Sequence, residues 1–99
     1  MSEQLTLEHF IPYLQQVFRV TRGHYTLTLV QLDVLPLGEA QAQVTGRPPF
    51  TLIFSGPPND VLPEGLHTIE AEDGTSFLIY VIPVQTASRD KQDYQAVFN

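Results

Sequence analysis

The fold is decided by one stretch, Arg47-Pro48-Pro49-Phe50-Thr51-Leu52-Ile53-Phe54-Ser55-Gly56-Pro57-Pro58. Within it, Phe50, Leu52 and Phe54 recur at every second position, the pattern of a β-strand with one buried face. Proline bounds the run on both sides, and proline cannot donate a hydrogen bond to a neighbouring strand. The stretch therefore predicts one short strand between two turns.

Similar alternation recurs along the chain. The run Val17-Phe18-Arg19-Val20 predicts a first strand, and His67 with Ile69 begins another. Asp73-Gly74 is a strong signal for a two-residue hairpin. The final run, Tyr94-Gln95-Ala96-Val97-Phe98-Asn99, places its aromatic residues on one face and predicts a last strand that packs in the core.

The longest strand candidate covers residues 25–35, and its alternation changes phase in the middle. The apolar set is Leu27 and Leu29 in the first half, but Val30 and Leu32 in the second half. A shift of one residue exchanges the two faces of a strand. The sequence therefore predicts a β-bulge or a strong bend near Val30, the device by which small barrels close.

Two other runs are less regular. Residues 77–82 are apolar at every position, which predicts a central strand buried on both faces and ended by Pro83. Within a polar stretch, Ala40, Ala42 and Val44 alternate and predict a weak additional strand.

A short helix is predicted before the first strand. Thr6 is a good capping residue, and Leu7, Phe10 and Ile11 share one face of the helix that would follow it. Pro12 favours the first position of a second turn. The whole pattern predicts an all-β fold, a small antiparallel barrel or half-open sandwich of about six strands with a short N-terminal helical segment.

The length, composition and net charge of the chain fit a single small β domain over residues 1–99, and they argue against several functions. With 99 residues the chain can bury a core without metal or disulfide. Its net charge of −6 opposes binding to nucleic acid and to anionic membranes, because both are polyanions. No secretory signal and no apolar run of membrane-spanning length are visible. A cytoplasmic protein without membrane contact is therefore expected, or one exported by a route that needs no such signal.

Catalytic signals are missing from the sequence. The chain has no cysteine, and His9, His24 and His67 stand in no metal-binding spacing. Ser55 lies in no nucleophile elbow, and the glycines form no phosphate loop. We therefore expect no enzyme activity, no cofactor, no metal ion, and no catalytic or cofactor-binding residues.

Val61-Leu62 is an apolar pair in a loop bounded by Pro58 and Pro63. Isolated apolar loop residues usually pack on their own domain, which favours a plug at the end of the barrel. In the other interpretation the pair is exposed and binds a partner. Val61 and Leu62 are therefore the candidate partner-binding residues.

Much of the chain carries a pattern that is specific as a whole. From residue 5 to residue 99 it combines the motifs Leu5-Thr6-Leu7-Glu8 with Phe10 and Pro12; Arg47 with Phe50, Leu52, Phe54, Gly56 and Pro57; Leu62 with Gly65; Pro83-Val84; and the terminal Tyr94-Gln95-Ala96-Val97-Phe98-Asn99. In this it resembles a family of small bacterial domains with no assigned function. His67 stands where the family pattern would have an aromatic residue. The resemblance implies no catalytic residues, and it implies an accessory role in a phage-tail-like or surface assembly.

These observations favour a non-enzymatic binding or assembly module that contacts an unidentified protein partner through its loops or an edge strand. The alternative is a small-molecule-binding β-barrel, which a ligand-filled interior would reveal. An enzyme ranks third and would require His, Asp and Glu side chains that converge in a pocket. Formation of a homo-oligomer through an edge strand stays open.

Overall fold

The computed structural model describes residues 5–34, 49–85 and 89–98. Two short helical turns precede six strands in this part of the chain. In order, the elements are α1 (Leu7–Phe10), the 3-10 turn η1 (Ile11–Tyr13), β1 (Val17–Val20), β2 (Thr26–Val34), β3 (Phe50–Gly56), β4 (Gly65–Ala71), β5 (Ser76–Val84) and β6 (Gln92–Phe98). The weak strand expected at Ala40, Ala42 and Val44 lies outside the described residues.

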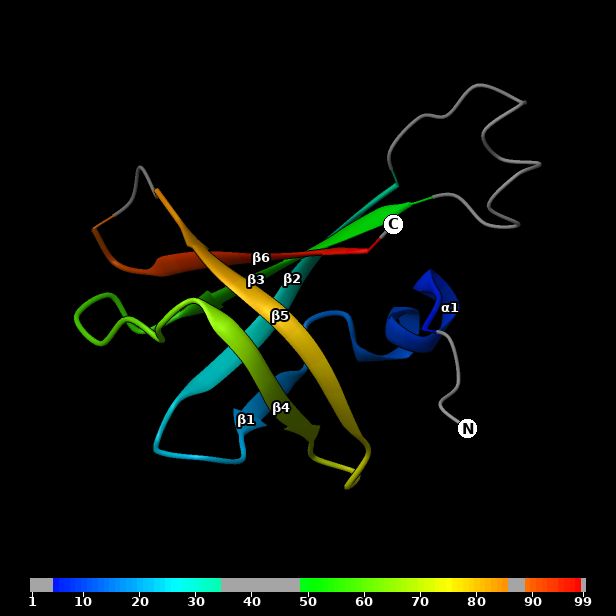
Figure 1. The fold of residues 1–99 in the computed structure, drawn as a ribbon, viewed down its shortest axis with the longest axis horizontal. Coiled ribbons are helices and arrows are strands. Elements are labelled where there is room, and N and C mark those ends of the chain that lie inside the picture. The colour runs from blue at the N-terminus through cyan, green and yellow to red at the C-terminus, as the bar shows by residue number, and fades with distance from the viewer. Residues whose placement is uncertain (1–4, 35–48, 86–88, 99) are drawn as a thin grey trace.

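The strands form a closed antiparallel barrel in the order β1-β2-β3-β6-β5-β4, and β4 pairs with β1 to close the ring (Figure 1). The prediction of a small all-β domain with a short N-terminal helix is confirmed, in its barrel form. Each of these strands has a neighbour on both sides. Closure of the ring removes the two outer edge strands of an open sheet, although β5 and β6 pair only over Ile82–Val84. Contact through an edge strand stays a prediction.

The predicted bulge lies in β2. Leu29 pairs with Phe54 on β3, but the next pair joins Gln31 to Ile53, so Val30 is the additional residue. The first part of β2 also pairs with β1, whereas the part after the bulge pairs only with β3. The phase shift seen in the sequence thus marks the bend with which β2 passes from one neighbour to the next.

Alternate side chains of the strands fill the interior of the barrel. The buried apolar core consists of Phe10, Phe18, Val20, Leu27, Leu29, Phe50, Leu52, Phe54, Leu62, Ile69, Ala71, Phe77, Ile79, Val81, Tyr94 and Ala96. Aromatic rings meet near its centre, where Phe18 and Phe54 lie edge to face with centroids 5.9 Å apart. No charged side chain is buried among the described residues. The predicted inward set on β3 and the predicted core strand at the C-terminus are both confirmed.

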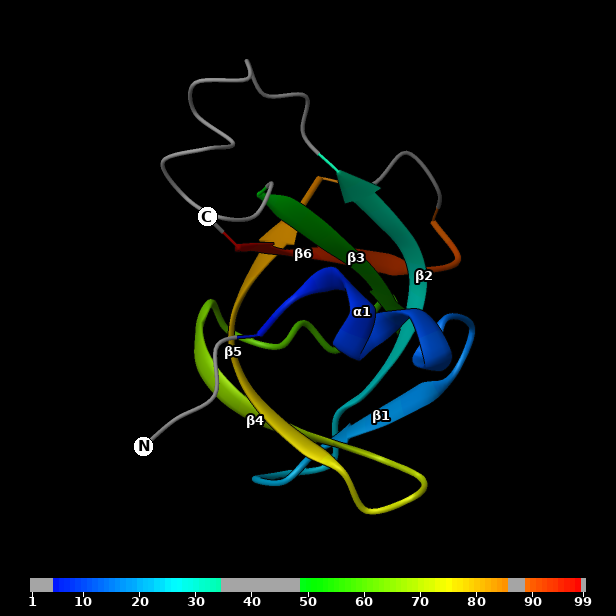
Figure 2. The same cartoon turned by 90° about the vertical axis from the view of Figure 1, so that its right-hand side faces the viewer.

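Helix α1 covers an opening in the barrel wall (Figure 2). β5 and β6 pair only over Ile82–Val84 and then diverge. The Phe10 ring fills the space between them, with centroid distances of 4.7 Å to Phe77 on β5 and 5.6 Å to Phe98 on β6. Thr6 is the N-cap residue, as predicted. A helix of one turn is thereby stabilised by burial of a single aromatic side chain.

The helical segment differs from its prediction in two details. The second turn begins at Ile11, one residue before Pro12. Ile11 was expected to share the buried face of Phe10, but it is 51% exposed. The tighter 3-10 turn rotates the chain relative to an α-helix, so the expected helical spacing no longer holds there.

Two strand predictions were also wrong in detail. β5 was expected to be buried on both faces, but a barrel strand has one inner face, and Leu78 and Tyr80 point outward with 58% and 49% exposure. Pro83 does not end β5, which continues to Val84. The hairpin after β4 has three residues rather than two, because the Ala71 N–H donates to the Thr75 carbonyl at 2.8 Å. Gly74 takes a φ of 91° in this turn, which favours glycine.

Candidate functional site

The loop between β3 and β4, residues 57–64, is fixed to the barrel by three contacts. The Leu62 backbone N–H donates to the Tyr94 hydroxyl at 2.8 Å. His67 Nε2 lies 2.8 Å from the carbonyl oxygen of Pro63. His24 Nε2 contacts the carboxylate of Asp60. These contacts reach the loop from β6, from β4 and from the turn between β1 and β2, so the loop is held at several points.

The apolar pair in this loop divides into an inner and an outer residue. Leu62 is 1% exposed and belongs to the core, whereas Val61 is 45% exposed. The plug interpretation is therefore confirmed for Leu62, whose side chain is not available to a partner in this structure. Val61 is presented at the surface, and its role in partner binding stays a prediction.

Tyr94 supports this loop from inside the barrel. Burial raises the pKa of its phenol above the usual value of 10.0, although the Leu62 N–H bond acts in the opposite direction. The hydroxyl therefore stays protonated at neutral pH. It accepts the hydrogen bond that a buried backbone N–H would otherwise lack.

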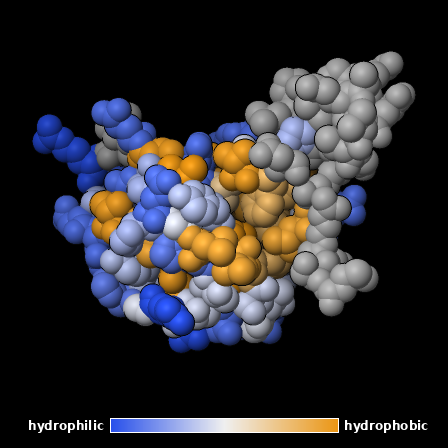
Figure 3. Space-filling view, viewed as in Figure 1, coloured by the Kyte–Doolittle hydropathy of each residue, from blue (hydrophilic) through white to orange (hydrophobic). Residues whose placement is uncertain are grey.

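A second candidate is the outer surface of β4 and β5, here called the β4–β5 face and defined by Leu66, Leu78 and Tyr80. Leu66 is opposite Tyr80 in the strand register, and Leu78 is the next outward residue on β5. The three are 61%, 58% and 49% exposed. Figure 3 shows apolar side chains at the surface where β5 crosses the front of the molecule. The sequence does contain a signal for this face, because residues 77–82 are apolar at every position. From the sequence alone, that run predicts a strand buried on both faces.

Opposite charges lie at different margins of this face. The Tyr80 hydroxyl donates to Glu64 Oε2 at 2.7 Å, and this bond raises the pKa of Tyr80. On the other margin, Arg22 lines a depression of about 240 Å³ together with Leu66 and Leu78. Sequence reasoning missed both charges, because the Glu64–Tyr80 bond and the position of Arg22 beside Leu66 arise only in the tertiary fold.

Arg22 differs from two other cations of the chain, Arg19 and Lys91. Arg19 forms an ion pair with Glu70 at 2.7 Å, and Lys91 lies 3.5 Å from Asp93. No ion pair joins Arg22 to any residue in the described parts of the chain. The Arg22 guanidinium, at the margin beside Leu66 and Leu78, therefore has no carboxylate partner among the described residues.

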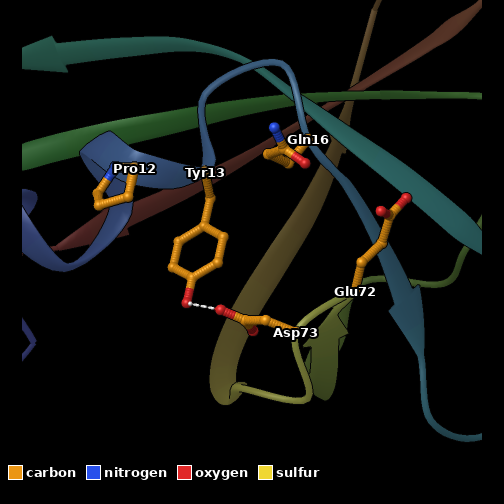
Figure 4. A pocket seen from close by; sticks show the side chains of 5 residues that line it. All are labelled: Pro12, Tyr13, Gln16, Glu72 and Asp73. Carbon is orange, nitrogen blue, oxygen red and sulfur yellow. Dashed lines mark hydrogen bonds between the residues drawn. The ribbon is translucent and has the colours of Figure 1, made fainter.

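A third candidate is an open depression of about 460 Å³ lined by Pro12, Tyr13, Gln16, Glu72 and Asp73. Figure 4 shows the Tyr13 ring reaching across to Asp73, and the Tyr13 hydroxyl donates to Asp73 Oδ2 at 2.8 Å. The Thr75 backbone N–H donates to Asp73 Oδ1 at 2.9 Å. Both bonds lower the pKa of Asp73 from its usual value of 3.8, and the bond from the Thr75 N–H has the larger effect. The carboxylate ties the hairpin to η1 and is poorly suited to act as a base.

The three histidines make separate structural contacts rather than one cluster. His9 Nδ1 accepts a hydrogen bond from the Thr6 backbone N–H at 2.9 Å, while His24 and His67 contact the loop 57–64. Within residues 5–34, 49–85 and 89–98, no three His, Asp or Glu side chains lie close enough together to hold a metal ion. In the same parts of the chain, no helix has the length and apolar character needed to cross a membrane.

The comparisons with known proteins identify a family. No curated protein and no solved structure matched the chain. A family model described as a domain of unknown function, DUF6916, matches residues 5–98. This match covers the whole barrel, from the residue before the Thr6 cap to the end of β6. The chain therefore belongs to the DUF6916 family of domains of unknown function.

Proposed function

We propose that this domain is a non-enzymatic binding or assembly module that contacts a protein partner through its outer surface. The observation that carries the proposal is the packing of the interior, which is filled by apolar side chains. A barrel packed in this way has its surface left for recognition, and Val61 is an apolar side chain held outward there. An accessory role in a phage-tail-like or surface assembly is the setting that we propose for this contact.

The same packing counts against the alternative of a small-molecule-binding barrel. Phe18, Leu52 and Phe54 fill the interior with exposures of 0% each. Ligand-binding barrels instead enclose a cavity of roughly 300–1,000 Å³. The depressions of about 460 and 240 Å³ described above lie at the surface, where bound molecules would stay in contact with water.

The arrangement of titratable groups supports a function without catalysis. A general base must lie within reach of a substrate and hold a suitable pKa. Asp73 is engaged by Tyr13 and Thr75, and its pKa is lowered rather than raised. His24 and His67 are engaged by the loop 57–64.

Val61 is the residue that we propose as the partner anchor in this loop. Pro57, Pro58 and Pro63 restrict the backbone on both sides of it. A restricted loop loses less conformational entropy on binding, so more of the apolar contact appears as affinity. The buried neighbour Leu62 fixes the position from which Val61 points outward.

Affinity enrichment from the native host, followed by mass spectrometry, tests this proposal. We expect the wild-type domain to retain a specific protein and Val61→Asp to retain markedly less of it. Val97→Asp is the matched control, because Val97 on β6 is 42% exposed and Val61 is 45% exposed. Equal retention by Val61→Asp and by the wild type would remove the loop from the interface.

A further inference from the structure

We propose that the β4–β5 face is a self-association surface, on which a second copy of this chain places its own β4–β5 face. In this contact Glu64 of each copy lies against Arg22 of the other. The inference goes beyond the proposed function and does not rest on Val61 or on the identity of another protein partner. It uses the outer face of two paired strands rather than an edge strand.

The first step is the apolar content of the face. Leu66, Leu78 and Tyr80 are adjacent on paired strands and are about half or more exposed. Continuous exposed apolar surface of this kind marks interaction sites in soluble proteins, because single exposed residues are common but clusters are costly. Tyrosine suits such a position since its ring can be buried while its hydroxyl stays bonded, here to Glu64.

The second step is the arrangement of charge. The face carries a carboxylate on one margin, at Glu64 beside Tyr80, and a guanidinium on another, at Arg22 beside Leu66. Dimers with twofold symmetry use the same patch on both copies, so residue i contacts residue j and residue j contacts residue i. A twofold axis within the interface, placed between the two margins, brings each carboxylate onto the other copy's guanidinium.

Charge complementarity selects this occupant. A partner of one sign would be attracted at one margin of the face and repelled at the other. A second copy meets both margins with the opposite charge, and it gives Arg22 the carboxylate that it lacks among the described residues. Such pairs set orientation and exclude wrong partners more than they add affinity.

The size and charge of the chain predict a weak dimer. Three partly exposed side chains offer much less than the roughly 800 Å² that each partner buries in a standard interface. Each copy also carries a net charge of −6, so two copies repel one another at long range. Association is therefore expected only at high protein concentration. Higher salt weakens both the repulsion between the two copies and the Glu64–Arg22 ion pairs that join them.

Sedimentation equilibrium of the purified domain tests the inference, with loading concentrations from about 10 μM to about 1 mM, where weak interfaces associate. We expect a monomer–dimer equilibrium. Leu78→Asp should abolish it, and Arg22→Glu and Glu64→Arg should each raise the dissociation constant at least about tenfold, because like charges then meet twice. The double variant Arg22→Glu with Glu64→Arg should restore dimerisation to within about threefold of the wild type.

Val97→Asp on the outer face of β6 is the control and should dimerise like the wild type. Circular dichroism and melting curves establish that each variant is folded, and Leu66→Asp serves in place of any variant that is not. A wild type that stays monomeric at the highest concentration would overturn the proposal. Failure of the double charge exchange to restore the dimer would overturn it too, as would equal disruption by Val97→Asp.

Loss of another protein's binding in Leu78→Asp, while the wild type alone is monomeric, would assign the face to that protein and contradict the proposal. Because these experiments use the purified chain alone, their failure leaves the separate Val61 proposal standing. Conversely, a loop that binds nothing leaves the dimer measurement unaffected.

Discussion

The Tyr94 hydroxyl accepts a hydrogen bond from the Leu62 backbone N–H at 2.8 Å, across 32 positions of sequence. This bond joins the inner face of β6 to the loop that precedes β4. Leu62 is buried next to it, while Val61 points to the surface. The packed interior of the barrel therefore sets the conformation of the loop in which the proposed partner anchor lies.

Tyr94→Phe tests the importance of this bond. The substitution keeps the ring but leaves the buried Leu62 N–H without its partner, which costs about 1–3 kcal/mol. Urea unfolding should show a loss in this range. Tyr80→Phe is the control, because Tyr80 bonds to an exposed carboxylate and its loss should stay within about 0.5 kcal/mol. Equal losses in the two variants would show that the buried bond has no special role.

Phe10→Ala tests whether α1 closes the opening between β5 and β6. Phe10 is fully buried against Phe77 and Phe98, so its truncation should cost about 3–5 kcal/mol. Ile11→Ala changes the adjacent residue, which is 51% exposed, and should cost far less. Thermal or urea unfolding of both variants measures the difference. If Phe10→Ala were as mild as Ile11→Ala, the helix would be an appendage and not part of the core.

The strand core could be predicted from the sequence where alternation is local. The bounds of β1, the inward set on β3, the bulge in β2 and the final strand all follow from short patterns that the structure confirms. The prediction for residues 77–82 was wrong about burial. Apolar side chains on both faces fit either a buried central strand or a barrel strand with an exposed apolar outer face. The pattern does not distinguish them, since the difference lies in what packs outside.

The candidate sites depend even more on tertiary contacts. Val61 and Leu62 are adjacent in sequence, yet Val61 is exposed and Leu62 is buried, and the Tyr94 hydroxyl that bonds to the Leu62 backbone lies 32 positions away. The depression beside Arg22 forms where the turn after β1 meets β4, and no motif in the sequence joins these segments.

The Asp73 contact predicts a dependence of stability on acid pH. Its pKa in the folded state lies below 3.8, so the carboxylate stabilises the fold above the unfolded-state value, and this contribution is lost as pH falls through the folded-state pKa. Tyr13→Phe should raise the Asp73 pKa only part of the way, because the bond from the Thr75 N–H remains. Carbon-detected NMR titration of the side-chain carboxyl measures both values. An unchanged pKa in Tyr13→Phe would show that the hydroxyl contact contributes nothing.

The most direct test of the central claim, recognition of a protein through the outer surface, is the affinity of the enriched partner for Val61→Asp. Isothermal titration calorimetry should give a dissociation constant at least about tenfold higher than that of the wild type, equivalent to roughly 1.4 kcal/mol. The melting temperature of the variant should be nearly unchanged, since Val61 is 45% exposed, and Val97→Asp should bind like the wild type. A folded Val61→Asp that binds with wild-type affinity would contradict the account.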